Sequence, residues 1–113
     1  MAEFENRVAL VTGGSTGIGA ATARLLAQKG AAVAVNYATS KKEAEQVVQD
    51  IRDSGGKAVA IQADVTKPAD VHRLAETVHS ELGLVDFLIN NAGGLLGREP
   101  IREMTLDLWN RTM

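Results

Sequence analysis

Four short apolar runs alternate with three stretches of helical periodicity, and this alternation constrains the fold more than any other feature. The runs cover about residues 7–11, 32–35, 57–61 and 85–89, and none of them alternates apolar with polar residues. Strands that are apolar on both faces are typical of a parallel sheet covered by helices on both sides. Because crossovers between parallel strands are right-handed, we predict an α/β fold with a doubly wound parallel sheet in the strand order 3-2-1-4. A ligand crevice is expected at the carboxyl ends of strands one and four.

The helical stretches predict where each helix buries its apolar side. The first is expected to begin near Ile18 and to end at Gly30, while Ser40 with Glu43 forms a capping box for the second and Thr66 caps the third. The predicted apolar stripes are Ile18, Ala21, Leu25 and Leu26; then Ala44, Val47, Val48 and Ile51; then Val71, Leu74, Ala75, Val78 and Leu82.

A glycine-rich stretch, Thr12-Gly-Gly-Ser-Thr-Gly-Ile-Gly19, joins the first strand to the first helix. Gly13, Gly17 and Gly19 lack Cβ atoms where the chain turns sharply, where a ligand can approach and where the helix packs on the strand. The free amides and the positive end of the helix favour a phosphate there. A tight strand-to-helix turn that binds nothing is the alternative.

Polar and small residues follow each strand, and a parallel sheet brings them to one edge. Asp64 offers a carboxylate to a ring amine or hydroxyl, and the small residues Ala92 and Gly93 leave space for a flat group. The alternatives are that Asp64 is a turn or cap residue and that Asn90 and Asn91 bond loose backbone ends. The segments are Thr12-Gly13, Asn36-Tyr37, Asp64-Val65 and Asn90-Asn-Ala-Gly93.

Composition limits the partners. The chain has 113 residues, about one domain, with a net charge of −2 and no cysteine. We therefore expect no nucleic-acid partner, no disulfide, no membrane span and a cytoplasmic location. His72, Glu76 and His79 share a helical face, but a solvated face is favoured over a metal site.

The strand-end motifs together resemble the short-chain dehydrogenase/reductase family. Thr-Gly-x-x-x-Gly-Ile-Gly follows strand one, Asp-Val strand three and Asn-Asn-Ala-Gly strand four. Residues 36–40 and the helix after them are most similar to the 3-oxoacyl-acyl-carrier-protein reductases and their sugar-dehydrogenase relatives. The resemblance implies a Rossmann-like sheet, with the adenine at Asp64 and Val65. It also implies a pyrophosphate and neighbouring ribose at Gly13, Ser15, Thr16, Gly17, Ile18 and Gly19, and an adenosine ribose beside Asn91, Ala92 and Gly93.

Charge at the end of the second strand predicts NADP(H), with NAD less favoured. NAD sites usually place a carboxylate there, whereas this chain has Asn36, followed by Lys41 and Lys42 at the start of a helix, where cations oppose the helix dipole. We expect a 2′-phosphate near Asn36, Tyr37, Ser40 and Lys41. The alternative is that Ser40 only caps the helix and that the lysines are solvated.

Tyr37-Ala-Thr-Ser-Lys41 spells the family's catalytic Tyr-x-x-x-Lys signature, but we interpret it as a coincidence. The catalytic pair lies one helical turn apart, whereas Tyr37 precedes the helix. The resemblance implies that the catalytic residues lie beyond residue 113 and that the sheet is truncated before strand five. Residues 1–113 are then the dinucleotide-binding portion of a single-domain oxidoreductase, with Phe87, Leu88 and Ile89 on an exposed apolar edge.

The expected function is hydride transfer between a nicotinamide and a carbonyl or hydroxyl substrate in the full-length protein. The substrate would be a small-molecule carbonyl compound or an acyl carrier thioester, and the full-length protein a homotetramer. This chain alone is expected to bind the cofactor without turnover and to contain no catalytic residue. A non-catalytic nucleotide-binding module, a sugar dehydrogenase of the same family and a methyltransferase-like domain are the alternatives.

Overall fold

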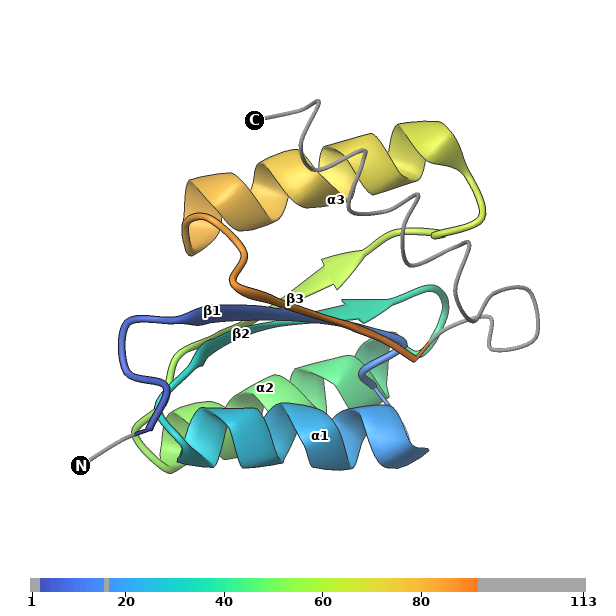
Figure 1. Cartoon of the computed structure of the whole chain (residues 1–113). Helices are drawn as coiled ribbons and strands as arrows, with labels where there is room; N and C mark the ends of the chain where they lie inside the picture. Colours follow the sequence, from blue (N-terminus) through green and yellow to red (C-terminus); the bar gives the residue numbers. More distant parts are fainter. Residues whose placement is uncertain (1–2, 16, 92–113) are drawn as a thin grey trace.

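The computed structural model describes residues 3–15 and 17–91, in which strands and helices alternate along the chain (Figure 1). The elements are β1 (Val8–Thr12), α1 (Gly17–Gln28), β2 (Ala32–Tyr37), α2 (Lys41–Asp53), β3 (Ala58–Gln62), α3 (Pro68–Glu81) and β4 (Phe87–Asn90). Each predicted apolar run became a strand and each periodic stretch became a helix.

The four strands form one parallel sheet in the order β3-β2-β1-β4, which confirms the predicted topology. Helices α1 and α2 cover one face and α3 covers the other, so the described chain has three layers (Figure 1). The crossovers put the carboxyl ends of all four strands at the right-hand edge in that view.

The core has two halves because alternate strand residues face opposite layers. Ala9, Val11, Val33 and Val35 belong to the half that includes α1 and α2. Leu10 and Ala34 belong to the half that includes α3. The predicted stripe of α2 is confirmed, because Ala44, Val47, Val48 and Ile51 are buried. In α3 the predicted Val71, Leu74, Ala75 and Val78 are buried, whereas Leu82 is the C-cap residue after the helix and packs partly buried against the core.

The predicted apolar face of α1 is wrong. Ile18 and Leu25 are 77% and 51% exposed, whereas Gly19, Ala20 and Ala23 are the buried residues of this helix. Small side chains face the sheet because they let the helix backbone come close to it, and the larger apolar residues then lie outside. Leu26 is the exception, since it packs partly buried against the core.

Two predicted helix starts also differ from the structure. Ser40 is the N-cap residue of α2 as predicted, but its side chain makes no capping hydrogen bond. Thr66 does not cap α3: the N-cap is Lys67, with Pro68 as the first helical residue. Proline suits that position because its missing N–H would have no helical partner there.

Strand β4 is the edge strand of the described sheet, as predicted, but its apolar side chains are half-buried and not exposed. Phe87 and Ile89 pack partly buried on the α1 and α2 side, and Leu88 packs on the α3 side. The ring of Phe87 lies 5.0 Å from that of Phe4, measured between centroids.

Asp86 joins the beginning of β4 to that of β1. Its carboxylate Oδ2 accepts a hydrogen bond from the Val8 N–H at 2.8 Å, and its own N–H donates to the Val8 carbonyl, also at 2.8 Å. Arg7 Nη1 lies 3.5 Å from the other carboxylate oxygen. Asp86 therefore holds β1 and β4 together at their amino ends.

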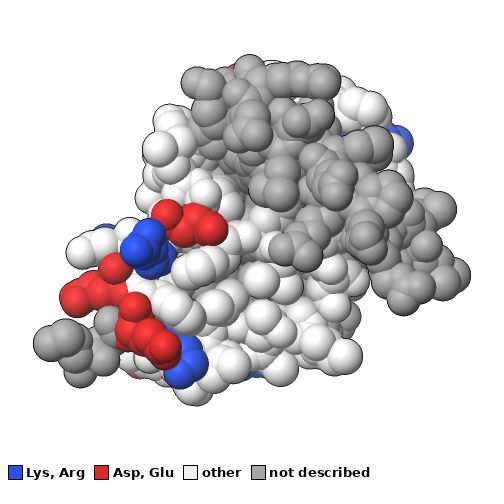
Figure 2. Space-filling view, viewed as in Figure 1, with Lys and Arg blue, Asp and Glu red and all other residues white. Residues whose placement is uncertain are grey.

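Charged side chains on the face shown in Figure 2 gather near the N-terminus, with acidic and basic groups side by side. Ion pairs at that end of the molecule join Arg7 to Asp86 and Lys29 to Glu3. None of the helices in residues 3–15 and 17–91 is long and apolar enough to cross a membrane.

Candidate functional site

The glycine-rich turn lies at the carboxyl edge of the sheet and is built by close backbone contact. Gly13 and Gly17 have φ angles of 62° and 57°, in the left-handed region that favours glycine. A Cβ on Gly19 would lie 2.2 Å from the Gly13 carbonyl oxygen, so only glycine fits without a shift. Both features match the predicted roles of these residues.

The start of α1 offers a cradle for an anion. A Cβ on Gly17 would meet no atom within 4 Å, so the backbone is open on that side. The first turn of α1 carries no acidic residue, and its amides have no partner within the helix. Ser15 beside it is buried and Ile18 is exposed, whereas Thr16 lies outside the described residues. This donor set fits a pyrophosphate.

Two asparagines at the end of β4, Asn90 and Asn91, bind the end of β1. The Thr12 hydroxyl donates to Asn90 Oδ1 at 3.0 Å, and the Asn91 N–H donates to the Thr12 carbonyl at 3.2 Å. Asn91 Nδ2 donates to the Gly13 carbonyl at 3.2 Å. Asn91 therefore lies against the glycine-rich turn, and its side-chain bond to a backbone carbonyl fits the alternative that it bonds loose backbone ends. Ala92 and Gly93 lie outside the described residues.

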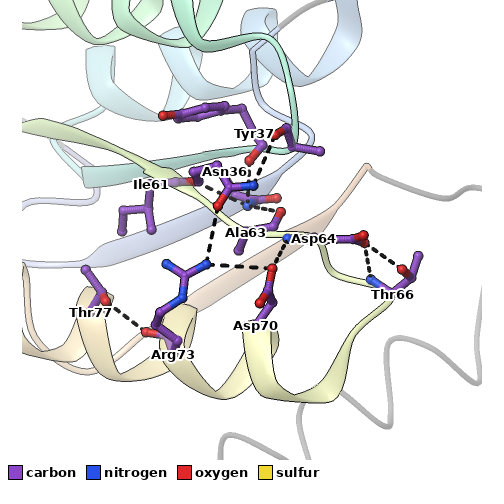
Figure 3. Close-up of polar contacts among 11 residues, drawn as sticks. Asn36, Tyr37, Ile61, Ala63, Asp64, Thr66, Asp70, Arg73 and Thr77 are labelled. Carbon is purple, nitrogen blue, oxygen red and sulfur yellow. Dashed lines mark hydrogen bonds and ion pairs between the residues drawn. The ribbon is translucent and has the colours of Figure 1, made fainter.

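Asn36 lies at the predicted edge, but its side chain is buried and points into the sheet. It is 2% exposed, and its amide donates to the carbonyls of Ile61 and Ala63 (Figure 3). The same amide accepts from the Gly13 N–H. Tyr37 is half-buried and packs against the core beside α1 and α2.

Ser40 and Lys41 stand at the start of α2, directly after the loop that follows β2. Lys41 is exposed, and Ser40 is half-buried with its hydroxyl outside any capping bond. Tyr37 ends β2 and Lys41 begins α2, so the two residues do not share a helix. Their Tyr-x-x-x-Lys spacing therefore does not give the catalytic geometry.

Asp64 forms a tight turn with Thr66 (Figure 3). Its Oδ1 accepts hydrogen bonds from the Thr66 hydroxyl at 2.6 Å and from the Thr66 N–H at 2.9 Å. These bonds favour the charged form and hold the pKa of Asp64 below its usual value. Asp70 Oδ2 accepts from the Asp64 N–H at 2.8 Å, and Val65 packs partly buried against the core. Asp64 thus fits the turn interpretation through one carboxylate oxygen.

Two residues help to build the site although neither was predicted to have a role in it: Thr12 was identified only as a strand end, and Asp70 was not among the predicted residues. Thr12 connects both asparagines at the end of β4 to β1, and Asp70 fixes the backbone at Asp64. Thr12 had a signal, since it is the one polar residue at the end of an apolar strand. Asp70 also had one: it is an acidic residue in the first turn of a helix that begins with Pro68.

Two other regions carry ionisable side chains close together. A hollow of about 820 Å³ lies at the opposite, amino edge of the sheet, where Arg24 and Asp50 form an ion pair at 2.8 Å. The hydrogen bonds from Gln46 and then Arg24 hold the pKa of Asp50 below its usual value. On α3, exposed His72 lies 3.6 Å from Glu76, and no group of three or more metal-ligating side chains occurs in the described ranges.

Comparison with known proteins assigns this chain to a family. The family model for short chain dehydrogenase matches residues 7–113. The short-chain dehydrogenase/reductase homolog YusS of Bacillus subtilis is 53% identical over 87 residues, which are 77% of this chain and 80% of that protein. The 3-oxoacyl-acyl-carrier-protein reductase FabG of Staphylococcus epidermidis is 51% identical over 88 residues, 78% of this chain and 36% of the reductase.

A solved structure gives the same result. The short chain dehydrogenase of Burkholderia cenocepacia, solved in complex with NADP, is 35% identical with a TM-score of 0.81, and the match covers 97% of this chain and 50% of that one. The chain thus spans half or less of the length of these last two relatives. With the parallel sheet, the glycine-rich turn and the strand-end asparagines in place, this chain belongs to the short-chain dehydrogenase/reductase family.

Proposed function

We propose that this chain binds NADP(H) along the carboxyl edge of the sheet as the cofactor-binding portion of an oxidoreductase. The observation that carries the proposal is the contact between Gly19 and Gly13, which brings the open, acid-free start of α1 against the end of β1. Such a start favours an anion through its free amides and its dipole. The pyrophosphate would lie at residues 13 and 15–19, the adenine at Asp64 and Val65, and the adenosine ribose at residues 91–93.

The preference for NADP(H) over NAD(H) is supported by the start of α2. The Ser40 hydroxyl makes no capping bond, and Lys41 brings an exposed ammonium beside it. The carboxylate that an NAD site usually presents to the ribose is absent at Asn36, Tyr37 and Ser40. We propose that Ser40 and Lys41 contact the 2′-phosphate beside Tyr37, with Asn36 behind them. The NADP complex of the Burkholderia relative also supports this choice.

In the full-length protein we propose an activity like that of the 3-oxoacyl-acyl-carrier-protein reductases, on a carbonyl compound or an acyl carrier thioester. A bound nicotinamide would supply the hydride for the carbonyl carbon. The residues of this chain bind and orient the dinucleotide, and the proton would come from a tyrosine outside it. A sugar dehydrogenase activity is the alternative substrate class, and the homotetramer remains part of the proposal for the full-length protein.

A second candidate is a non-catalytic nucleotide-binding module. It is favoured by the short-chain dehydrogenase/reductase homolog YusS, because the match covers 80% of that protein. Both candidates predict NADPH binding by these 113 residues without turnover. Ketone-dependent oxidation of NADPH by the purified chain would contradict the proposal that the catalytic residues lie elsewhere.

Titration with NADPH and NADH, followed by nucleotide fluorescence, tests the site. We expect tighter binding of NADPH, and we expect Lys41→Ala to weaken NADPH about tenfold, because a charged hydrogen bond contributes roughly 1.5 kcal/mol, while NADH binding stays unchanged. Lys57→Ala is the matched control, since it removes a lysine just before β3 at the opposite edge. Tighter NADH binding would overturn the NADP(H) preference, and absence of binding by either nucleotide would overturn the site.

A further inference from the structure

Asn36 is a polar side chain inside the sheet, and every part of its amide is hydrogen bonded. It follows four apolar residues of β2, a strand that lies between β1 and β3. Its Nδ2 donates to the carbonyls of Ile61 at 3.3 Å and Ala63 at 3.1 Å (Figure 3). Its Oδ1 accepts from the Gly13 N–H at 3.3 Å. Because the carbonyls only accept and the N–H only donates, these partners fix the orientation of the amide.

The backbone of Asn36 holds the next residue of the turn. Its carbonyl accepts from the Gly14 N–H at 3.0 Å. Asn36 therefore accepts hydrogen bonds from two consecutive backbone amides of the glycine-rich turn, one through its side chain and one through its main-chain carbonyl. Neither amide is then directed at an anion, which leaves the amides at the start of α1 for that purpose.

The Gly13 peptide is held on its other side as well. Its carbonyl accepts from Asn91 Nδ2 at 3.2 Å and lies against Gly19. Gly13 has a φ of 62°, in the left-handed region. Because glycine has no side chain, nothing within the residue itself fixes this backbone conformation. The turn thus depends on contacts from outside, and Asn36 provides the one that reaches across to β3.

We propose that Asn36 is a positioning residue for pyrophosphate binding: it does not touch the dinucleotide but fixes the turn so that the amides of α1 face the phosphates. This inference rests on the proposed function and names the residue that shapes its phosphate site. It differs from a direct role at the 2′-phosphate, because the side chain is buried and points away from that group's place beside Ser40.

Two ligands distinguish positioning from direct contact in the variant Asn36→Ala. NADPH contains the pyrophosphate, whereas adenosine 2′-monophosphate lacks it but keeps the 2′-phosphate. We expect the Kd for NADPH to rise about tenfold, as for a lost buried hydrogen bond, and the Kd for adenosine 2′-monophosphate to change less than about twofold. Amide exchange of Gly13, followed by NMR, should become about tenfold faster. Asn36→Ser provides the same readouts if Asn36→Ala does not fold, because its shorter side chain cannot span from Gly13 to β3.

Val78→Ala is the matched control. Val78 is fully buried on α3, on the other side of the sheet, so the variant loses stability without touching the turn, and it should leave both ligand affinities and Gly13 exchange unchanged. A parallel loss of affinity for both ligands would overturn positioning in favour of direct contact. Unchanged Gly13 exchange in the Asn36 variant would also overturn it. Absence of NADPH binding by the unsubstituted chain would instead contradict the proposed function, and the exchange measurement would still decide whether Asn36 holds the turn.

Discussion

Replacing Gly19 with alanine tests whether the contact between α1 and β1 defines the site. The added Cβ would lie 2.2 Å from the Gly13 carbonyl oxygen and 2.7 Å from Asn91 Nδ2. Real Cβ atoms essentially never come within 3.0 Å of such neighbours, and the nearest one is backbone, so the turn must move. That movement would also stretch the hydrogen bond from Asn91 to Gly13.

The expected loss of stability follows from three opposing contributions. Forcing a methyl group into a packed site costs about 1–3 kcal/mol, and losing the Asn91–Gly13 hydrogen bond costs about 1 kcal/mol. Alanine regains about 1 kcal/mol because it favours the helix more than glycine does. The net loss is about 1–3 kcal/mol, which for a domain of this size lowers Tm by about 4–12 °C.

Thermal unfolding of Gly19→Ala measures the loss of stability, and NADPH titration measures whether the moved turn also weakens binding of the dinucleotide. Gly55→Ala is the matched control, because Gly55 has a φ of 91° in open space beyond the end of α2. That variant should lose about 1 kcal/mol through backbone strain alone and keep its affinity for NADPH. A Tm for Gly19→Ala at or above that of the unsubstituted chain, or unchanged NADPH affinity, would refute the steric argument.

Two further outcomes are expected. Because the hydrogen bonds of Thr66 lower the pKa of Asp64, the carboxylate stabilises the fold above its ordinary pKa of 3.8, and this contribution is lost as pH falls through the lower folded value. Thr66→Ala should raise the pKa of Asp64 toward 3.8, and an unchanged NMR titration of that carboxyl would contradict the hydrogen-bond explanation. Leu25→Gln should change the free energy of unfolding, measured in urea, by less than about 0.5 kcal/mol, because Leu25 is half exposed. A loss above about 1.5 kcal/mol would mean that Leu25 is buried after all, as the sequence predicted for this face of α1.

The sheet could be predicted because each strand is recognisable from its own short run of residues. Runs such as Val8–Thr12 are short, apolar on both faces and separated by helices, and few topologies satisfy that pattern. The apolar side of α1 could not be predicted from large residues, since the helix lies against the sheet through Gly19, Ala20 and Ala23. The spacing of those small residues was the signal for the buried face.

The edge on which the candidate residues lie could be predicted, but the direction of their side chains could not. Strand ends identify the edge on which Asn36, Asp64 and Asn91 lie, because parallel strands share their carboxyl edge. Whether an amide points outward or inward depends on partners distant in the sequence. Asn36 points inward because carbonyls at Ile61 and Ala63 are within its reach, and nothing around residue 36 in the sequence indicates that.

The double contact between Asp86 and Val8 decides how β4 is aligned with β1. Since both strands are apolar on each face, sliding one past the other would cost little in hydrophobic burial, and the side-chain pattern alone discriminates weakly between alignments. Asp86 removes this ambiguity, because only one offset lets it both donate to and accept from Val8. The same offset brings Asn90 opposite Thr12 at the far end. A carboxylate at the amino edge therefore determines which residues meet where the dinucleotide is proposed to bind.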